Sequence, residues 1–156
     1  MTAGHRVEGI DVREEWIDYN GHVNDSAYAV ICTEANEVFL DHVGVSADYQ
    51  ARTGCTTYTV ESHLRYLAEV GRGAVLHADV LPVDADAKRL RLHTTVWNGD
   101  EAVLTGEYLF LHVDQAEGRV TPFPPDRAEA IAAEVSRYAD VPRPDHLGRG
   151  VRAPNP

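Results

Sequence analysis

Apolar residues between positions 28 and 42 recur at intervals of three and four, which is the spacing of one face of an α-helix. The stripe consists of Tyr28, Ile31, Cys32, Ala35, Val38, Phe39 and His42. Directly before it, Asn24, Asp25 and Ser26 are residue types that cap helix N-termini, and Gly44 suits the position after a helix C-terminus. The pattern predicts a long amphipathic helix that begins near Asn24 and ends near Gly44.

Runs in which polar and apolar residues alternate predict strands on both sides of this helix. One short strand is expected before it, over residues 6–13, and four after it, over residues 58–70, 74–83, 89–97 and 101–113. Asn98-Gly99-Asp100 separates the last two and predicts a hairpin, because Asn-Gly tolerates the positive φ angles of a type I′ turn. Residues 45–55 show little pattern and are expected to form a loop. Residues 126–138 are expected to form a second, surface helix.

A strand, a long helix and then an antiparallel meander indicate the α+β class. The helix has to bury its apolar stripe against the sheet, because no other element is long enough to cover it. With 156 residues, the chain is large enough for one domain with a substantial core. We place that domain at residues 1–141. Residues 142–156 are rich in Pro, Gly and Arg and are expected to be a poorly ordered tail.

The net charge of −11 argues against a protein that binds nucleic acid or anionic membranes. No run approaches the roughly 18 apolar residues of a membrane span, and the N-terminus lacks the apolar segment of a secretory signal. The two cysteines, Cys32 and Cys55, provide no disulfide framework. A soluble cytoplasmic protein is the simplest expectation.

The candidate chemistry is concentrated just before the helix. Asp18, Asn20 and His22 fall within five residues, and Gly21 among them permits a tight backbone turn. A carboxylate held on such a turn would face a helix N-terminus, where free N–H groups can bind a developing oxyanion. An ordinary polar turn that caps a helix would have the same residue types, so the spacing alone leaves both interpretations open.

The segment from Asp18 to Asn24 resembles the active-site loop of hotdog-fold thioesterases. Asp18, Asn20, His22, Val23 and Asn24 match the D-x-N-x-H-V-N-N run of plant acyl-ACP thioesterases, and Asp18 and Gly21 match the D-P-A-G run of 4-hydroxybenzoyl-CoA thioesterases. The resemblance implies a hotdog fold, in which an antiparallel sheet of about five strands wraps the long helix.

The same resemblance implies roles for the loop residues. Asp18 would be the nucleophile or general base, because a carboxylate can attack a thioester directly or activate a water. The backbone N–H that polarises the thioester carbonyl would be that of Asp25, next to the turn made by Gly21. Asn20 and His22 would orient water or substrate. Asn24 is a candidate for substrate binding, although its position favours a helix N-cap or loop brace.

Glu69 is a second candidate carboxylate. Residues 64–71 resemble the strand of plant acyl-ACP thioesterases that carries a glutamate directly before a cysteine. Val70 stands at the cysteine's position, which excludes a cysteine nucleophile there. Strand alternation puts Glu69 on the face away from the helix unless a bulge intervenes, so a solvated glutamate remains an alternative. Glu34 and Glu37 could also project from the helix, although a solvent-facing position is the simpler expectation for both.

Within the family, residues 16–28 and 52–61 most resemble the betainyl-CoA thioesterases of carnitine breakdown, some of which are fused to carnitine dehydrogenase. Betaine's quaternary ammonium would suit an aromatic cage. The candidate rings are Trp16, Tyr19, Tyr28, Tyr58 and Tyr66, for which packing in the core or sheet is the alternative. Two other functions stay open: a thioesterase for acyl-ACP or another acyl-CoA, and a non-catalytic hotdog module that binds acyl groups.

No cofactor or metal is expected. The histidines on the predicted strands form neither an H-x-H nor an H-E-x-x-H pair, and the chain has no G-x-S-x-G elbow and no phosphate-binding loop. The expected partners are the acyl-CoA substrate and further copies of the chain. An open five-stranded sheet leaves unpaired edges, which a homodimer or homotetramer would protect.

Overall fold

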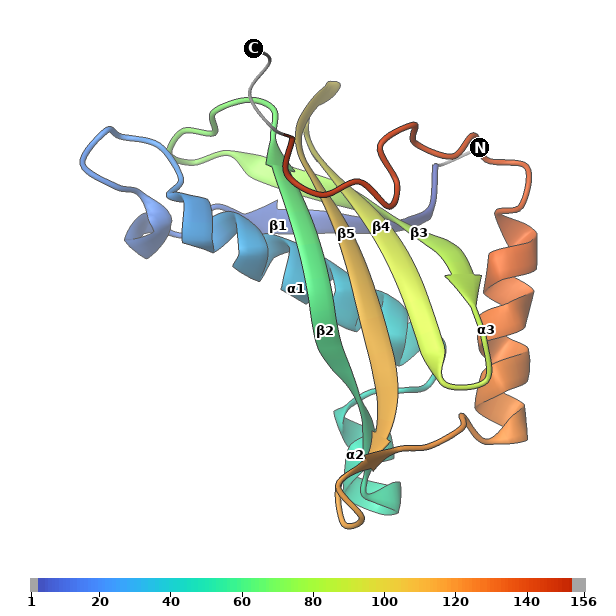
Figure 1. Ribbon diagram of the computed structural model, residues 1–156. Coiled ribbons are helices and arrows are strands. Elements are labelled where there is room, and N and C mark those ends of the chain that lie inside the picture. Colours follow the sequence, from blue (N-terminus) through green and yellow to red (C-terminus); the bar gives the residue numbers. More distant parts are fainter. Residues whose placement is uncertain (1–2, 153–156) are drawn as a thin grey trace.

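The computed structural model describes residues 3–152 (Figure 1). Its strands are β1 (His5–Asp11), β2 (Cys55–Tyr66), β3 (Val75–Ala85), β4 (Arg89–Asn98), β5 (Glu101–Asp114) and the short β6 (Arg119–Val120). Its helices are α1 (Asp25–His42), α2 (Ala47–Thr53) and α3 (Pro125–Arg137), with a 3₁₀ turn, η1, at Glu14–Trp16. Within residues 3–152, no helix is both long and apolar enough to cross a membrane.

The main strands form one antiparallel sheet in the order β1-β3-β4-β5-β2, and β6 pairs with β5. The sheet curls around α1, α3 lies beside β3, and α2 lies at the far end of β2 (Figure 1). The predicted α+β class is confirmed. The order leaves β1 and β2 at the two edges, and the long edge strand β2 leads into the candidate site.

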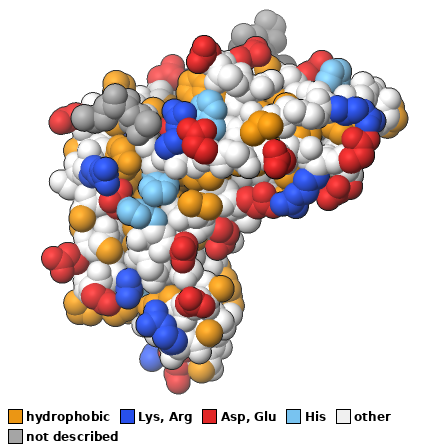
Figure 2. Space-filling model, turned by 180° about the vertical axis from the view of Figure 1, so that it is seen from behind, with side chains coloured by type: hydrophobic (Ala, Val, Ile, Leu, Met, Phe, Trp, Pro, Cys, Tyr) orange, Lys and Arg blue, Asp and Glu red, His pale blue; other side chains and the backbone are white. Residues whose placement is uncertain are grey.

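Helix α1 starts and ends where the sequence predicts. The Asn24 side chain accepts a hydrogen bond from the Ala27 N–H as its N-cap, and Gly44, with φ +76°, follows the C-cap. The buried side of the helix consists of Ala27, Tyr28, Ile31, Cys32, Ala35, Asn36, Phe39 and Leu40. Figure 2 shows the face of the molecule on which α1 lies, and acidic and basic side chains are interspersed over it.

The predicted apolar stripe was wrong at two positions of α1. Val38 is 45% exposed and His42 is also exposed, whereas Asn36 is buried in their place. The Oδ1 atom of Asn36 accepts a hydrogen bond of 2.6 Å from the Thr94 hydroxyl on β4, while its Nδ2 atom has no partner among residues 3–152. A buried polar group whose hydrogen bond is made costs little, and hydropathy alone does not reveal such a pairing.

The prediction of an irregular loop at residues 45–55 is also wrong, because these residues contain α2. This helix is seven residues long, too short for a periodic pattern to be seen, and it ends at Gly54 with φ +71°. Its one buried side chain is Tyr49, whose hydroxyl lies 2.9 Å from Nε2 of His112 on β5. The helix is therefore fixed by a tertiary contact rather than by its own pattern.

Two strand predictions need correction. The strand β2 ends at Tyr66 rather than at Val70, because the amides of Leu67 and Ala68 both donate to the Val103 carbonyl and the chain leaves the sheet. The predicted hairpin between β4 and β5 is present, but within residues 3–152 only glycines have positive φ. Gly99, at φ +58°, is the first central residue, which matches a type II′ turn rather than type I′.

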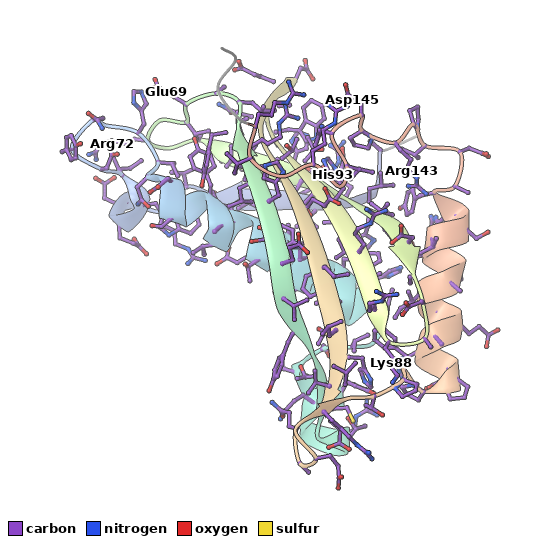
Figure 3. All side chains as sticks on the ribbon, viewed as in Figure 1. Glu69, Arg72, Lys88, His93, Arg143 and Asp145 are labelled. Atoms are coloured by element: carbon purple, nitrogen blue, oxygen red, sulfur yellow. The ribbon has the colours of Figure 1, made fainter. Side chains whose placement is uncertain are left out.

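Residues 142–152, the C-terminal strap, cross the face of the sheet opposite α1 (Figures 1 and 3). Neighbouring residues of β4 show this, since Thr94 bonds Asn36 of α1 while His93 contacts His146 of the strap, and successive side chains of a strand point to opposite faces. The poor order expected from the composition stays a prediction, and the strap contacts the sheet through His146 and Gly148. Residues 153–156 of the expected tail lie outside the described residues.

Candidate active site

The loop before α1 is a small hairpin. Ile17 and Val23 form an antiparallel bridge, the Asp18 N–H donates to the His22 carbonyl at 2.9 Å, and the Gly21 N–H donates to the Asp18 carbonyl at 3.0 Å. Gly21 has φ +84°, a conformation that residues with a Cβ adopt only with strain. The turn predicted from the glycine is therefore present, and it brings Asp18 and His22 side by side.

The Asp18 carboxylate is held in place by its own loop. Its Oδ1 atom accepts a hydrogen bond of 2.7 Å from the backbone N–H of Asn20, and its Oδ2 atom accepts one of 3.4 Å from the Asn20 side-chain amide. These contacts fix the carboxylate in an Asx turn. Within residues 3–152 no arginine or lysine forms an ion pair with Asp18.

This hairpin pairs with the segment that follows β2. His22 forms a bridge with Gly71, and the Val23 N–H donates to the Val70 carbonyl at 2.8 Å. The pairing brings Glu69 beside His22, with 3.6 Å between Glu69 Oε2 and His22 Nε2. Strand alternation does not apply to Glu69, because β2 has already ended at Tyr66. The sequence left open whether Glu69 faces the candidate site, and in the structure Glu69 faces the loop before α1.

Asn24 braces the loop with all of its polar side-chain atoms. Its Oδ1 atom accepts hydrogen bonds from the Ala27 N–H at 3.0 Å and the Ser26 hydroxyl at 2.5 Å. Its Nδ2 atom donates to the Trp16 carbonyl at 2.7 Å, and its backbone N–H donates to the same carbonyl at 2.8 Å. Asn24 is thus both helix cap and loop brace, and it does not line the pocket described next.

The backbone N–H of Asp25 is open. Of the hydrogen bonds among residues 3–152, none engages this group, although the Asp25 side chain accepts one of 2.9 Å from the Ser26 N–H. As the first residue of α1, Asp25 presents this N–H at the positive end of the helix dipole. An oxyanion could therefore be bound at this point.

A pocket of about 490 Å³ joins these groups. Its lining residues are Asp18, Asn20, His22, Val23, Asp25, Tyr28, Tyr66, Leu67, Ala68 and Glu69. Glu69 lies on the connection between β2 and β3, with Arg72 a few residues further along (Figure 3). The described lining contains carboxylates but no arginine or lysine, and Arg72 is paired with Glu14. The pocket is therefore acidic.

Tyr28 and Tyr66 form the aromatic wall of the pocket. Their ring centroids are 5.6 Å apart with an interplanar angle of 77°, an edge-to-face pair. The Tyr28 hydroxyl donates to the Ala68 carbonyl at 3.2 Å, and the Tyr66 hydroxyl donates to the Asp25 carbonyl at 3.4 Å. Burial raises the pKa of Tyr28, so its hydroxyl stays a donor at neutral pH.

The other candidate rings of the cage lie elsewhere. Trp16 is buried beneath the Arg13 guanidinium, 4.6 Å from the ring centroid, and Tyr19 is 97% exposed. Tyr58 lies towards the far end of β2, where its hydroxyl accepts a hydrogen bond of 3.0 Å from Gln115. None of these three rings lines the pocket. Of the expected aromatic residues, the structure brings only Tyr28 and Tyr66 to it.

The remaining carboxylate candidates are also outside the pocket. Glu34 forms an ion pair with Arg13, and Glu37 is exposed on α1. Among residues 3–152, no group of three or more His, Cys, Asp and Glu side chains is arranged to hold a metal ion. Sequence reasoning missed Leu67 and Ala68 as lining residues, and their residue types carry no chemical signal that could have identified them.

Comparison with known proteins identifies the family. The model of the thioesterase-like superfamily matches residues 12–131. The chain belongs to this superfamily. A solved structure of a Staphylococcus aureus protein in complex with CoA superimposes on this thioesterase-like chain with a TM-score of 0.86 at 28% identity, covering 96% of this chain and 94% of that one. The predicted family and the hotdog fold are confirmed.

Two curated relatives carry more specific names. The L-carnitine dehydrogenase/betainyl-CoA thioesterase of Agrobacterium fabrum is 41% identical over 95% of this thioesterase-like chain, which spans 30% of that relative's length. The betainyl-CoA thioesterase of Pseudomonas aeruginosa is 29% identical, and the match covers 92% of this chain and 91% of that protein.

We expect Asn24→Ala to destabilise the protein by about 1–3 kcal/mol, because the variant loses a helix cap and leaves the Trp16 carbonyl with one donor fewer. Asn24→Ser keeps the cap acceptor but cannot reach Trp16, so its loss should be smaller. Urea unfolding of both variants measures the difference. An Asn24→Ala protein of unchanged stability but altered KM would instead make Asn24 a substrate-binding residue.

Proposed function

We propose that the protein hydrolyses an acyl-CoA thioester in the pocket between the loop before α1 and the end of β2. The observation that carries the proposal is the placement of a fixed carboxylate, Asp18, and an open helix N-terminal N–H, that of Asp25, on the walls of one pocket. The first supplies a base or nucleophile, and the second supplies a donor for the oxyanion.

The reaction can follow either of two balanced courses. As general base, Asp18 takes a proton from water, and the water oxygen forms the new bond to the thioester carbon. As nucleophile, Asp18 forms that bond itself, and water later hydrolyses the mixed anhydride. In both courses the carbonyl oxygen becomes an oxyanion near the Asp25 N–H, and the C–S bond breaks to release CoA as the thiolate.

The neighbouring polar residues act as positioning groups in this proposal. Asn20 fixes both oxygens of Asp18 through its backbone and side-chain N–H groups. His22 and Glu69, 3.6 Å apart, flank the same space and would orient the attacking water. Gly21 supplies the turn that lets these side chains converge.

Cytoplasmic location, expected from the composition, stays a prediction.

Asp18→Asn should lower turnover at least about 10²-fold while leaving the protein folded, because the amide retains the shape of the side chain but neither accepts a proton nor attacks carbon efficiently. Release of free CoA measured with a thiol reagent gives the rate, and circular dichroism checks the fold. Asp48→Asn, which changes an exposed carboxylate on α2, is the matched control. Near-normal turnover in Asp18→Asn would exclude Asp18 as base or nucleophile.

For the acyl group we propose betaine, which carries a quaternary ammonium. Two features of the pocket support this choice besides the names of the relatives. The edge-to-face rings of Tyr28 and Tyr66 offer π surfaces to a cation, and Asp25 and Glu69 add negative charge nearby. Trp16 and Tyr19, expected from the sequence to join the cage, are not used in this proposal.

Betainyl-CoA should be preferred over a neutral isostere with a tert-butyl head. A cation over aromatic faces gains roughly 0.5–2 kcal/mol, which corresponds to about two- to thirtyfold in kcat/KM. Tyr66→Leu should remove most of this preference, whereas Tyr19→Leu, at an exposed position of the loop outside the pocket, should keep it. Equal kcat/KM values for the two thioesters in the unmodified protein would exclude betaine as the preferred acyl group. The protein would then be a thioesterase for another short-chain acyl group.

We also propose that the active form is a homodimer joined along β2. This 12-residue strand lies at the sheet edge, and its exposed side chains include Tyr58, Val60 and Tyr66. An exposed, partly apolar edge of this length is a surface that proteins normally cover. The open pocket lies where β2 ends, so a second copy of the chain packed along β2 would supply a further wall.

Sedimentation at micromolar concentration should therefore give about twice the chain mass of 17.2 kDa, or four times if dimers pair. Val60→Lys should shift the protein towards monomer and reduce thioesterase activity, because it places a charge in the proposed interface. Val120→Lys on β6, which pairs with β5 on the side away from β2, is the control. A protein that sediments as a monomer and is fully active would contradict the proposal.

A further inference from the structure

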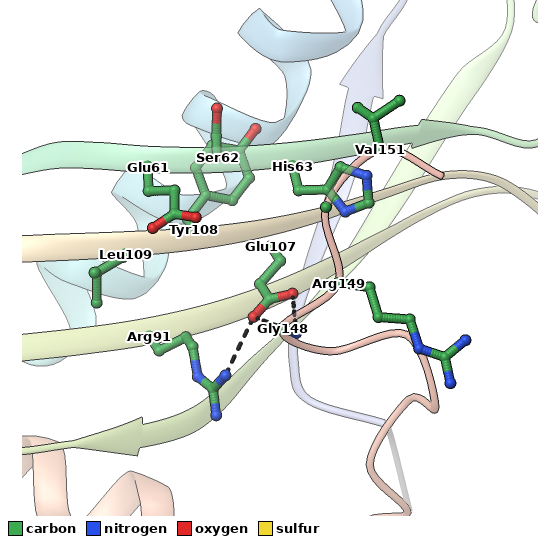
Figure 4. Close-up of a pocket in the computed structure, with 11 residues that line it drawn as sticks. Glu61, Ser62, His63, Arg91, Glu107, Tyr108, Leu109, Gly148, Arg149 and Val151 are labelled. Carbon is green, nitrogen blue, oxygen red and sulfur yellow. Dashed lines mark hydrogen bonds and ion pairs between the residues drawn. The ribbon is translucent and has the colours of Figure 1, made fainter. Parts of the chain in front are cut away.

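The C-terminal strap contacts the sheet at two points, and Figure 4 shows the one between Gly148 and Glu107. His63 on β2, Glu107 on β5 and His93 on β4 are neighbours in the strand register and form a row across the outer face. The strap's Gly148 N–H donates to Glu107 at 2.9 Å, and His146 Nε2 lies 3.0 Å from His93 Nε2. The strap thus crosses this row and covers His93, which is 3% exposed.

The contact between the two imidazoles depends on their protonation. A hydrogen bond between two Nε2 atoms requires one to donate its proton and the other to accept with a lone pair. Protonation of one ring preserves the hydrogen bond, because a protonated ring can still donate to a neutral one. A second added proton leaves no acceptor and places two cations in contact. The contact between His93 and His146 is therefore stable only while at least one ring is neutral.

Charged groups of both signs surround the pair. The surrounding groups are His63 and Arg65 on β2, Arg91 on β4, Glu107 on β5, and Asp145 on the strap. Glu107 is already engaged by Arg91 at 3.3 Å and by the Gly148 N–H. Asp145 lies 3.7 Å from Nδ1 of His146, on its exposed side. Arg65 acts on both rings, whereas no carboxylate is among the causes of the shift at His93.

The pKa values agree with this geometry. Burial, with His146 and Arg65 as further causes, lowers the pKa of His93 from 6.5 to about 4. Burial and Arg65 also lower the pKa of His146, against the opposing effect of Asp145 and Glu107. Both rings therefore favour the neutral form while the strap is in place.

We propose that the His93–His146 contact is an acid-released latch, which holds residues 142–152 on the sheet at neutral pH and lets them detach when both rings are protonated, while the domain stays folded. The latch lies outside the candidate active site and does not depend on the proposed function. Its release would uncover the outer face of the sheet. The strap's end lies along residues 61–63 of β2, a few residues before Tyr66 enters the pocket.

The direction of the pH dependence follows from linkage. Both histidines have a lower pKa in the latched state than in the released state, where the ordinary value of 6.5 applies. The contribution of the latch to strap docking is therefore complete above about pH 6.5. It is lost as the pH falls towards about 4, the pKa of the latched His93. Because release takes up between one and two protons, the docking constant should fall roughly 10- to 100-fold per pH unit in that window.

Two-dimensional ¹H–¹⁵N NMR of the full chain from pH 7.5 to 4 tests the latch directly. The amide signals of Gly148 and Gly150 should move to random-coil positions in a transition steeper than one proton. Signals of the buried core, such as Leu92 on β4 and Ile31 on α1, should stay in place. Long-range ¹H–¹⁵N spectra of the imidazoles should show neutral rings above the transition.

His146→Gln provides the decisive comparison, because glutamine can still accept a hydrogen bond from His93 but does not titrate. Its strap transition should become shallower, involving about one proton, and move to lower pH. His77→Gln, which changes a histidine of β3 that stacks on Trp97 away from the strap, should behave as the unmodified protein. Strap signals that do not move down to pH 4, that move identically in His146→Gln, or that move only with unfolding of the core would each overturn the proposal.

Discussion

The hydrogen bond from the Val23 N–H to the Val70 carbonyl joins two segments that are far apart along the chain, and the candidate site depends on it. One segment is the turn that carries Asp18 and His22, and the other is the connection that carries Glu69. With the adjoining bridge between His22 and Gly71, this pairing extends sheet-like geometry beyond the end of β2. As a result, side chains from both segments surround one pocket, which neither segment could form alone.

How much could be predicted from the sequence differs between levels of structure. Helix α1 and the main strands were predictable because each carries a local period, and the loop from Asp18 to Asn24 was recognisable because its residue types sit at fixed spacing. Helix α2 and the buried Asn36 were not, since they depend on single tertiary partners, His112 and Thr94. Sequence alone contains no local signal for such a partner.

The site itself was only partly predictable for the same reason. The position of Glu69 depends on where β2 ends, and that is decided by two amides bonding the carbonyl of Val103 on a neighbouring strand. Which aromatic rings line the pocket could not be predicted from the local sequence either. Tyr28 and Tyr66 meet because helix and sheet pack, whereas Trp16 turns into the core beneath Arg13. The contacts of the strap with His93 and Glu107 could not be predicted from its composition.

If the proposed substrate is bound, the electrostatics of the pocket set opposing demands on its two ends. Carboxylates and tyrosine rings favour a cationic acyl group, yet CoA carries phosphate charges, and the net charge of the chain is −11. Attraction at the acyl end acts over short distances and is little screened, whereas repulsion of the exposed phosphates is weakened by salt. The local field can therefore select the acyl group without preventing binding of the carrier.

The pairing between Val23 and Val70 uses backbone atoms only, and this has an evolutionary consequence. The Val70 side chain is fully buried, so position 70 is constrained by packing in the core, and only a side chain of similar volume can replace it while the frame stays intact. The valine of this chain and the cysteine at the matching position of plant acyl-ACP thioesterases are two outcomes that such a frame permits. A loop that is anchored through main-chain atoms keeps its geometry when a buried side chain at the anchor is exchanged for one of similar volume.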